Sequence, residues 1–156
     1  MSAPDRALTD LYRQIVLDHS RHPRNQRRPE RYDREAEGHN LLCGDKVRVY
    51  LRLQDDALED VAFEASGCAI CLASASLMTE TVRSRSVHEA RTSIDRFDRA
   101  LATGGGENLA GDLAALGGVS QYPSRIRCAT LPWKTLQAAL DSSPATVTTE
   151  KASPSR

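Results

Sequence analysis

The placement of cysteine constrains this chain more than any other feature of its sequence. Its four cysteines occur at three distant places: Cys43 with Asp45 beside it, the pair Cys68 and Cys71, and Cys128. These gaps are much longer than the ligand spacing within a zinc finger, so no local loop can gather the thiols. The fold must therefore bring them together, unless each is packed separately.

Composition narrows the class of protein. At 156 residues the chain can form one domain that buries a core without disulfides. Basic and acidic residues number 21 each, which gives no long-range attraction to nucleic acid or to a membrane surface. We see neither the ~20 apolar residues of a membrane span nor a secretory signal, so we expect a cytoplasmic protein. In that reducing compartment, thiols are more often free, catalytic or metal-bound than paired.

The hydrophobic pattern predicts an α+β fold, with a three-stranded antiparallel sheet packed by about five helices. Period-two alternation and turn residues predict strands at Tyr32–Glu37, Val47–Leu53 and Leu58–Ala65. Helical spacing predicts helices at Arg6–His19, Ile70–Ser84, His88–Leu101, Leu109–Leu116 and Ser124–Leu140. We expect Gly117 and Gly118 to stop the fourth helix.

Two segments lie outside this pattern. Residues 142–156 are rich in Ser, Thr and Pro and poor in apolar residues, so we expect one domain at 1–141 followed by a disordered tail. The segment from Arg21 to Arg34 is locally basic. A solvated loop is the favoured interpretation of it; a docking surface for an acidic protein remains open, and RNA binding is favoured least.

The cysteine-bearing segments suit metal chemistry. Three thiolates and one carboxylate, from Cys43, Asp45, Cys68 and Cys128, match a tetrahedral zinc ion or an iron–sulfur cluster. Glycine stands beside the ligands in the first two segments, where it allows tight turns.

The last of these cysteines has a distinctive setting. Cys128 falls in the first turns of the last predicted helix, where we expect the helix N-terminus to lower the thiol pKa. Four negative ligands exceed the charge of a divalent ion. Arg125 and Arg127, which flank Cys128, could offset that excess or swing over the site.

Other interpretations of the cysteines explain less. Four small buried side chains would not account for the Cys43-Gly-Asp45 triplet. A thioredoxin-like role for Cys68 and Cys71 would need a βαβ pattern that is missing. His39 is the histidine nearest the candidate ligands, and we interpret it as a loop residue rather than a ligand.

Several sequence blocks together resemble the U-type iron–sulfur assembly proteins. They are Leu11-Tyr-Arg-Gln-Ile-Val-Leu-Asp-His19, His22-Pro-Arg-Asn25, Asn40-Leu-Leu-Cys-Gly-Asp45, Gly67-Cys-Ala-Ile-Cys-Leu-Ala-Ser-Ala-Ser76 and Cys128-Ala-Thr-Leu-Pro-Trp133. Within that family the chain is most similar to the SufU branch. Arg127 stands where IscU-like proteins carry a histidine ligand, and Gly104–Val119 resembles an extra segment of SufU proteins.

The resemblance implies a SufU/IscU-like fold with a metal site at one tip. It implies zinc on Cys43, Asp45, Cys68 and Cys128, with Cys128 accepting persulfide sulfur from a SufS-type cysteine desulfurase. That partner would supply a histidine in exchange for one thiolate. The chain would then act as a zinc-dependent sulfurtransferase only with the desulfurase, and not as a stand-alone enzyme, and would pass sulfur to downstream SUF assembly proteins.

Three questions stay open at this level. The same ligands could hold iron or a [2Fe–2S] cluster on a scaffold, because zinc and iron accept the same donors. The centre could also be a structural zinc site in an interaction module. Cys71 could be a resolving thiol, a spare cluster ligand or a packed side chain, and packing is the favoured interpretation.

Overall fold

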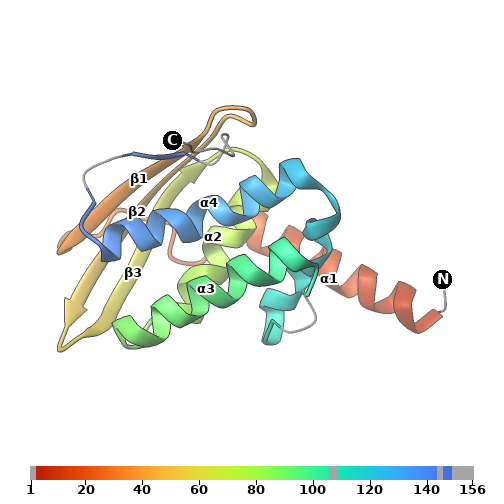
Figure 1. Ribbon diagram of the computed structural model, residues 1–156, viewed down its shortest axis with the longest axis horizontal. Helices are drawn as coiled ribbons and strands as arrows, with labels where there is room; N and C mark the ends of the chain where they lie inside the picture. Colours follow the sequence, from red (N-terminus) through yellow and green to blue (C-terminus); the bar gives the residue numbers. More distant parts are fainter. Residues whose placement is uncertain (1–2, 106–108, 144–145, 149–156) are drawn as a thin grey trace.

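The chain folds as a sheet with helices packed on one face (Figure 1). The computed structural model describes residues 3–105, 109–143 and 146–148. In chain order the elements are α1 (Ala3–Arg21), β1 (Arg34–Asn40), β2 (Asp45–Gln54), β3 (Ala57–Ser66), α2 (Ala69–Val82), α3 (Val87–Thr103), the 3-10 helix η2 (Gly111–Gln121), α4 (Pro123–Leu140) and β4 (Val147–Thr148). The α+β class is therefore confirmed. No helix among the described residues is long and apolar enough to cross a membrane.

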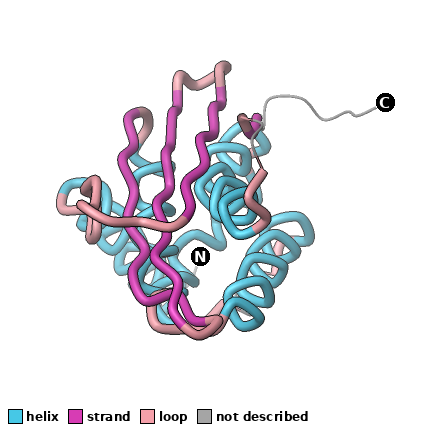
Figure 2. The backbone as a smooth tube through the Cα atoms, turned by 90° about the vertical axis from the view of Figure 1, so that its left-hand side faces the viewer, coloured by secondary structure: helices cyan, strands magenta, loops and turns pink. Residues whose placement is uncertain are grey.

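Three long strands form an antiparallel meander (Figure 2). The structure confirms the middle strand that the alternation predicted, because its apolar residues Val47, Val49 and Leu51 are fully buried under the helices. The first strand is longer than predicted and continues to Asn40. Its ladder with β2 therefore closes at the pair formed by Asn40 and Asp45.

The three predicted strands are antiparallel, but the sheet has a fourth strand, so the prediction of a three-stranded, purely antiparallel sheet is wrong. The short strand β4 pairs in parallel with β1, opposite Gly38 and His39, and gives the mixed order β3-β2-β1-β4. Two residues are too few to show alternation, which is why the pattern missed them. The rest of the predicted tail, 144–145 and 149–156, lies outside the described residues.

The fourth predicted helix also differs from expectation. It is a 3-10 helix that continues to Gln121, past the predicted stop at Gly117 and Gly118. Its buried side chains Leu113, Leu116 and Val119 recur every third residue, which is the 3-10 period rather than the α-helical one. The predicted break at 103–108 lies partly outside the described residues.

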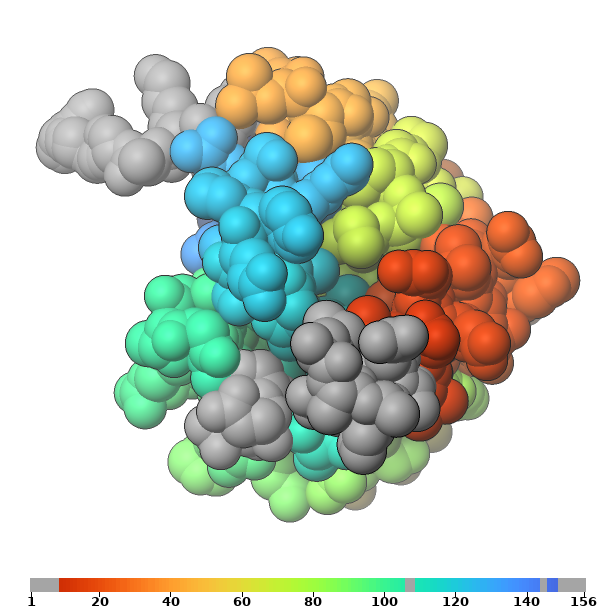
Figure 3. Space-filling view, turned by 90° about the vertical axis from the view of Figure 1, so that its right-hand side faces the viewer, coloured from red at the N-terminus to blue at the C-terminus, as the bar shows by residue number. Residues whose placement is uncertain are grey.

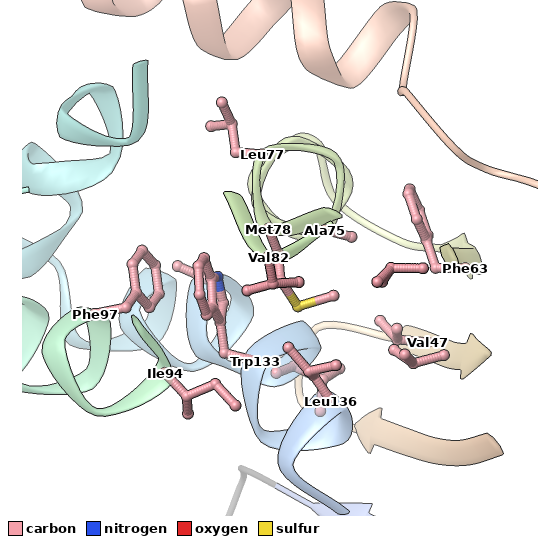
Figure 4. Packing of buried hydrophobic residues seen from close by; sticks show 14 of the residues in the cluster. Val47, Phe63, Ala75, Leu77, Met78, Val82, Ile94, Phe97, Trp133 and Leu136 are labelled. Atoms are coloured by element: carbon pink, nitrogen blue, oxygen red, sulfur yellow. The ribbon is translucent and has the colours of Figure 1, made fainter. Parts of the chain in front are cut away.

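The core lies between the sheet and the helices, with α2 at its centre (Figure 4). Small residues such as Ala73 and Ala75 let neighbouring elements approach α2 closely. The Trp133 ring stacks on Phe97 with centroids 4.4 Å apart, and its Nε1 donates to Ser74 Oγ at 3.0 Å. This packing fixes α4 against α2, which matters because the last cysteine lies on α4.

The basic segment between α1 and β1 crosses the outer face of the sheet (Figure 2). It is anchored to the edge of β3, where the backbone N–H of Phe63 donates to Asn25 O at 3.0 Å. Arg27 pairs with Asp60 at 2.7 Å, and Arg28 lies over the Tyr50 ring. These arginines therefore bind the protein's own surface.

Candidate metal centre

The tip of the β1–β2 hairpin carries the first two predicted ligands. Asn40 O accepts a hydrogen bond from the Cys43 N–H at 3.3 Å, and Gly44 takes the left-handed conformation at φ 72°. This turn leaves Cys43 half-buried and starts β2 at Asp45, whose side chain is buried. Both side chains thus lie at one end of the sheet.

The start of α2 brings the third predicted ligand, Cys68, to the same place. Cys68 is the N-cap of α2, and its backbone N–H donates to Asp45 Oδ1 at 2.8 Å. The Cys68 Sγ lies 3.9 Å from Asp45 Oδ2. Gly67 has φ 140°, and a Cβ on it would stand 2.2 Å from Asp45 Oδ1. The glycine is therefore required for this approach.

The fourth predicted ligand, Cys128, lies on α4. The ligand atoms of Cys43, Asp45 and Cys128 all lie within 4.8 Å of one another. Cys68 stands just outside this trio and reaches it through Asp45. Four side chains remote in sequence therefore converge where the hairpin tip, the α2 start and the first turns of α4 adjoin (Figure 3).

The pKa of the Cys128 thiol is raised, whereas the sequence predicted that it would be lowered. Burial is the largest cause, followed by hydrogen bonding to Asp45, Cys43 and Cys68. The prediction fails because the helix-terminus effect is confined to the first turn, and α4 begins at Pro123, more than a turn before Cys128. A bound cation would reverse the balance, since it stabilises the thiolate.

The two arginines that were predicted to support the site lie on α4. Arg125 is exposed and Arg127 is half-buried, so their roles beside Cys128 stay predictions.

His39 lies on strand β1 rather than in a loop. It pairs with Glu37 on the side of the strand opposite the buried Asn40, which places it away from the thiols.

Cys71 is fully buried in the hydrophobic core. Burial raises the pKa of its thiol, and electrostatic interactions with Asp45, Cys68 and Cys43 add to the effect. Both observations agree with the packing interpretation of this residue.

Sequence reasoning missed one residue of the centre, Asn40. It is fully buried, and its Nδ2 lies 3.4 Å from Asp45 Oδ2 and 3.7 Å from Cys128 Sγ. A signal existed, because Ala36, Gly38 and Asn40 alternate with polar residues. The predicted strand ended too early to include it.

The residues present fit a metal ion. Three sulfurs and one carboxylate oxygen are the donors that zinc and iron sites use. Gly67 leaves the space in which the carboxylate can turn toward the thiols. The fold and the site together define an α+β protein in which distant segments bring together three cysteines and one aspartate that could hold a metal ion.

Comparison with known proteins gives the family. The chain belongs to the family described as NifU-like N-terminal domain, which residues 11–147 match. It is 37% identical to the zinc-dependent sulfurtransferase SufU of Bacillus subtilis (strain 168) over 132 residues, covering 83% of this chain and 89% of that protein. It is 35% identical to the iron–sulfur cluster assembly scaffold protein IscU of Streptococcus pyogenes serotype M1 over 137 residues, covering 85% and 84%.

A solved structure supports the same assignment. A proposed iron–sulfur cluster assembly scaffold protein for the SUF system from Fervidobacterium islandicum AW-1 superposes with a TM-score of 0.75 at 34% identity. The match covers 81% of this chain and 94% of that one. The expected SufU/IscU-like fold and U-type family are therefore confirmed.

Proposed function

We propose that this protein takes part in iron–sulfur cluster assembly by accepting persulfide sulfur on Cys128 from a SufS-type cysteine desulfurase. Zinc held by Cys43, Asp45, Cys68 and Cys128 would keep the site's thiols deprotonated. The observation that carries the proposal is the convergence of three candidate ligand atoms within 4.8 Å of one another, with a third thiol, that of Cys68, 3.9 Å from the Asp45 carboxylate. Similarity to a zinc-dependent sulfurtransferase supports zinc as the ion.

The transfer is a thiol–persulfide exchange. The Cys128 thiolate attacks the terminal sulfur of the desulfurase persulfide and forms a new S–S bond. The old S–S bond breaks, and the electron pair leaves with the desulfurase cysteine, which takes up a proton. Net oxidation state is conserved, so neither an oxidant nor a reductant is needed. The chain is then a co-substrate of the desulfurase in the cytoplasm rather than a stand-alone enzyme, and it would hand the sulfur to downstream SUF assembly proteins.

The test measures desulfurase turnover and the mass of the peptide that contains Cys128. With free cysteine and a SufS-type desulfurase, the native protein should stimulate turnover and gain one sulfur atom at Cys128. Cys128→Ser should lose both effects. Unchanged stimulation by this variant, or sulfur found only on another cysteine, would refute the assignment of Cys128.

A scaffold for a [2Fe–2S] cluster is the second candidate. Its support is similarity to a protein named as an IscU scaffold, together with a donor set that holds iron as well as zinc. Anaerobic reconstitution with iron and sulfide, followed by transfer to an apo-ferredoxin, separates the two functions. A protein that keeps zinc and forms no transferable cluster counts against the scaffold, whereas one that delivers the cluster to the apo-ferredoxin is a scaffold.

A further inference from the structure

The side chain of Asn40 joins two of the proposed ligands without being a ligand itself. It occupies the last position of β1, directly opposite Asp45 in the antiparallel ladder. Its Nδ2 lies 3.4 Å from Asp45 Oδ2 and 3.7 Å from Cys128 Sγ. Because an amide nitrogen carries two hydrogens, one group can donate to both atoms.

The packing of α4 on β1 explains why Asn40 reaches Cys128. A Cβ on Gly38 would lie 2.2 Å from Thr135 Oγ1, so α4 lies closer to β1 here than a larger residue would allow. Asn40 follows Gly38 on the same inward face of β1. Cys128 precedes Thr135 by about two turns of α4. The close approach of β1 and α4 at Gly38 and Thr135 therefore continues along both elements and brings Asn40 next to Cys128.

The amide can point only one way. Its Oδ1 is the buried side-chain oxygen or nitrogen that has no hydrogen-bond partner in the described part of the chain. Rotating the amide by half a turn would set that oxygen against the Asp45 carboxylate and the sulfur. An unpaired buried acceptor is unfavourable, and an apolar side chain would avoid it. The donation from Nδ2 to the two ligands is what accounts for an amide at this position.

We infer that Asn40 is a positioning residue of the metal centre. Its amide holds the Asp45 carboxylate and the Cys128 sulfur at the separation from which both reach one ion. It also stays hydrogen-bonded to that sulfur when the thiol is not coordinated. This inference rests on the proposed function, because it concerns the same centre.

Three variants test the inference. Asn40→Asp replaces the donor by an acceptor of the same shape, and Asn40→Leu removes the amide without adding charge. Asn25→Asp is the matched control, because its amide donates to Thr79 Oγ1 on α2, away from the thiols. The metal-free proteins are titrated with Co²⁺, followed by thiolate-to-cobalt absorption, and Zn²⁺ is then added in competition.

We expect both Asn40 variants to bind cobalt and zinc at least ~10-fold more weakly than the native protein, which is the usual effect of losing a group that supports a ligand. The control should bind as the native protein does. The melting midpoint of metal-free Asn40→Leu should stay close to the native one, since loss of the unpaired oxygen offsets the loss of the two donations from Nδ2.

Three other outcomes would contradict either the positioning role of Asn40 or the proposed function. Native affinity and native spectra in both Asn40 variants would overturn the positioning role. A metal-free Asn40→Leu that melts well below the native protein would also overturn it, because the residue would then be structural. Failure of the native protein to bind either metal would overturn the proposed function instead.

Discussion

A single backbone position, Gly67, decides where the Asp45 carboxylate can lie. Its φ of 140° is strained for any other residue, and a Cβ would stand 2.2 Å from Asp45 Oδ1. We expect Gly67→Ala to displace the carboxylate and break its hydrogen bond to the Cys68 N–H. The variant should lose about 2–3 kcal/mol of unfolding free energy and roughly 10–100-fold in zinc affinity. Urea unfolding and zinc competition measure the two effects.

Gly118→Ala provides the control for that substitution. Gly118 lies in η2 with open space around it and no strained φ, so its variant should match the native protein in both measurements. Native zinc affinity in Gly67→Ala would show that Asp45 can bind the ion from another position. The backbone argument would then be wrong.

Substitution of Cys71 tests whether its thiol is only packed in the core or also takes part in the chemistry of the site. Because it is fully buried in the core, Cys71→Ala should cost about 1 kcal/mol of stability, as for loss of one methyl-sized group. It should leave zinc stoichiometry, cluster reconstitution and desulfurase stimulation unchanged. These are measured on the purified variant beside the native protein. A lost cluster or a Cys128 persulfide that no longer resolves would instead make Cys71 a ligand or a resolving thiol.

At the scale of elements, hydrophobic periodicity predicted the long strands and the α-helices but did not predict the short strand β4. The alternation around Val47–Leu53 gave the sheet, and helical spacing gave α1, α2, α3 and α4 within a few residues. The short strand β4 depends on pairing with β1, which no local pattern records. Asn40 was missed because the predicted first strand ended at Glu37, although the alternation continues to Asn40. The convergence of the candidate ligands could be predicted because cysteine has distinctive chemistry and glycine stands beside it at tight turns.

The contact between α1 and α2 depends on a buried histidine. His19 on α1 is 2% exposed, and its Nδ1 lies 2.7 Å from Ser76 Oγ on α2. Arg24 N–H also donates to Ser76 Oγ, so the hydroxyl can donate to a neutral imidazole. Burial lowers the pKa of His19 in the folded protein below its ordinary 6.5.

This lowered pKa predicts a pH-dependent stability with a definite sign. Between the lowered pKa of the folded protein and pH 6.5, the unfolded chain binds a proton at His19 that the folded protein does not, so the free energy of unfolding falls as pH falls. Above that pH the contribution of His19 is fully present. His19→Asn keeps an acceptor near Ser76 and should flatten the slope. Urea unfolding between pH 5 and 7 measures it, with exposed His88→Asn as the control. An equal slope in native and His19→Asn proteins would contradict the assignment.

At the scale of the whole molecule, the candidate centre lies at one end of the hydrophobic core, which includes Cys128 and contacts Cys43 and Cys68. The core joins the sheet to α2, α3 and α4 through side chains such as Phe97 and Trp133. The centre lies at one end, where an ion would tie the hairpin tip to the starts of α2 and α4. Removal of the ion should therefore loosen that end and leave the rest folded.

Chelation of zinc tests whether the core stays folded when the ion is removed. We expect the metal-free protein to keep its far-ultraviolet circular dichroism, because its core does not depend on the ion. Its melting temperature should fall by roughly 10 °C: an ion at a thousand times its dissociation constant contributes about 4 kcal/mol. Adding zinc should restore the midpoint in proportion to the logarithm of its free concentration, and Cys43→Ser should weaken that response. A metal-free chain that is unfolded at 25 °C would favour the structural zinc module, since a site that holds the fold together cannot release a ligand for sulfur transfer.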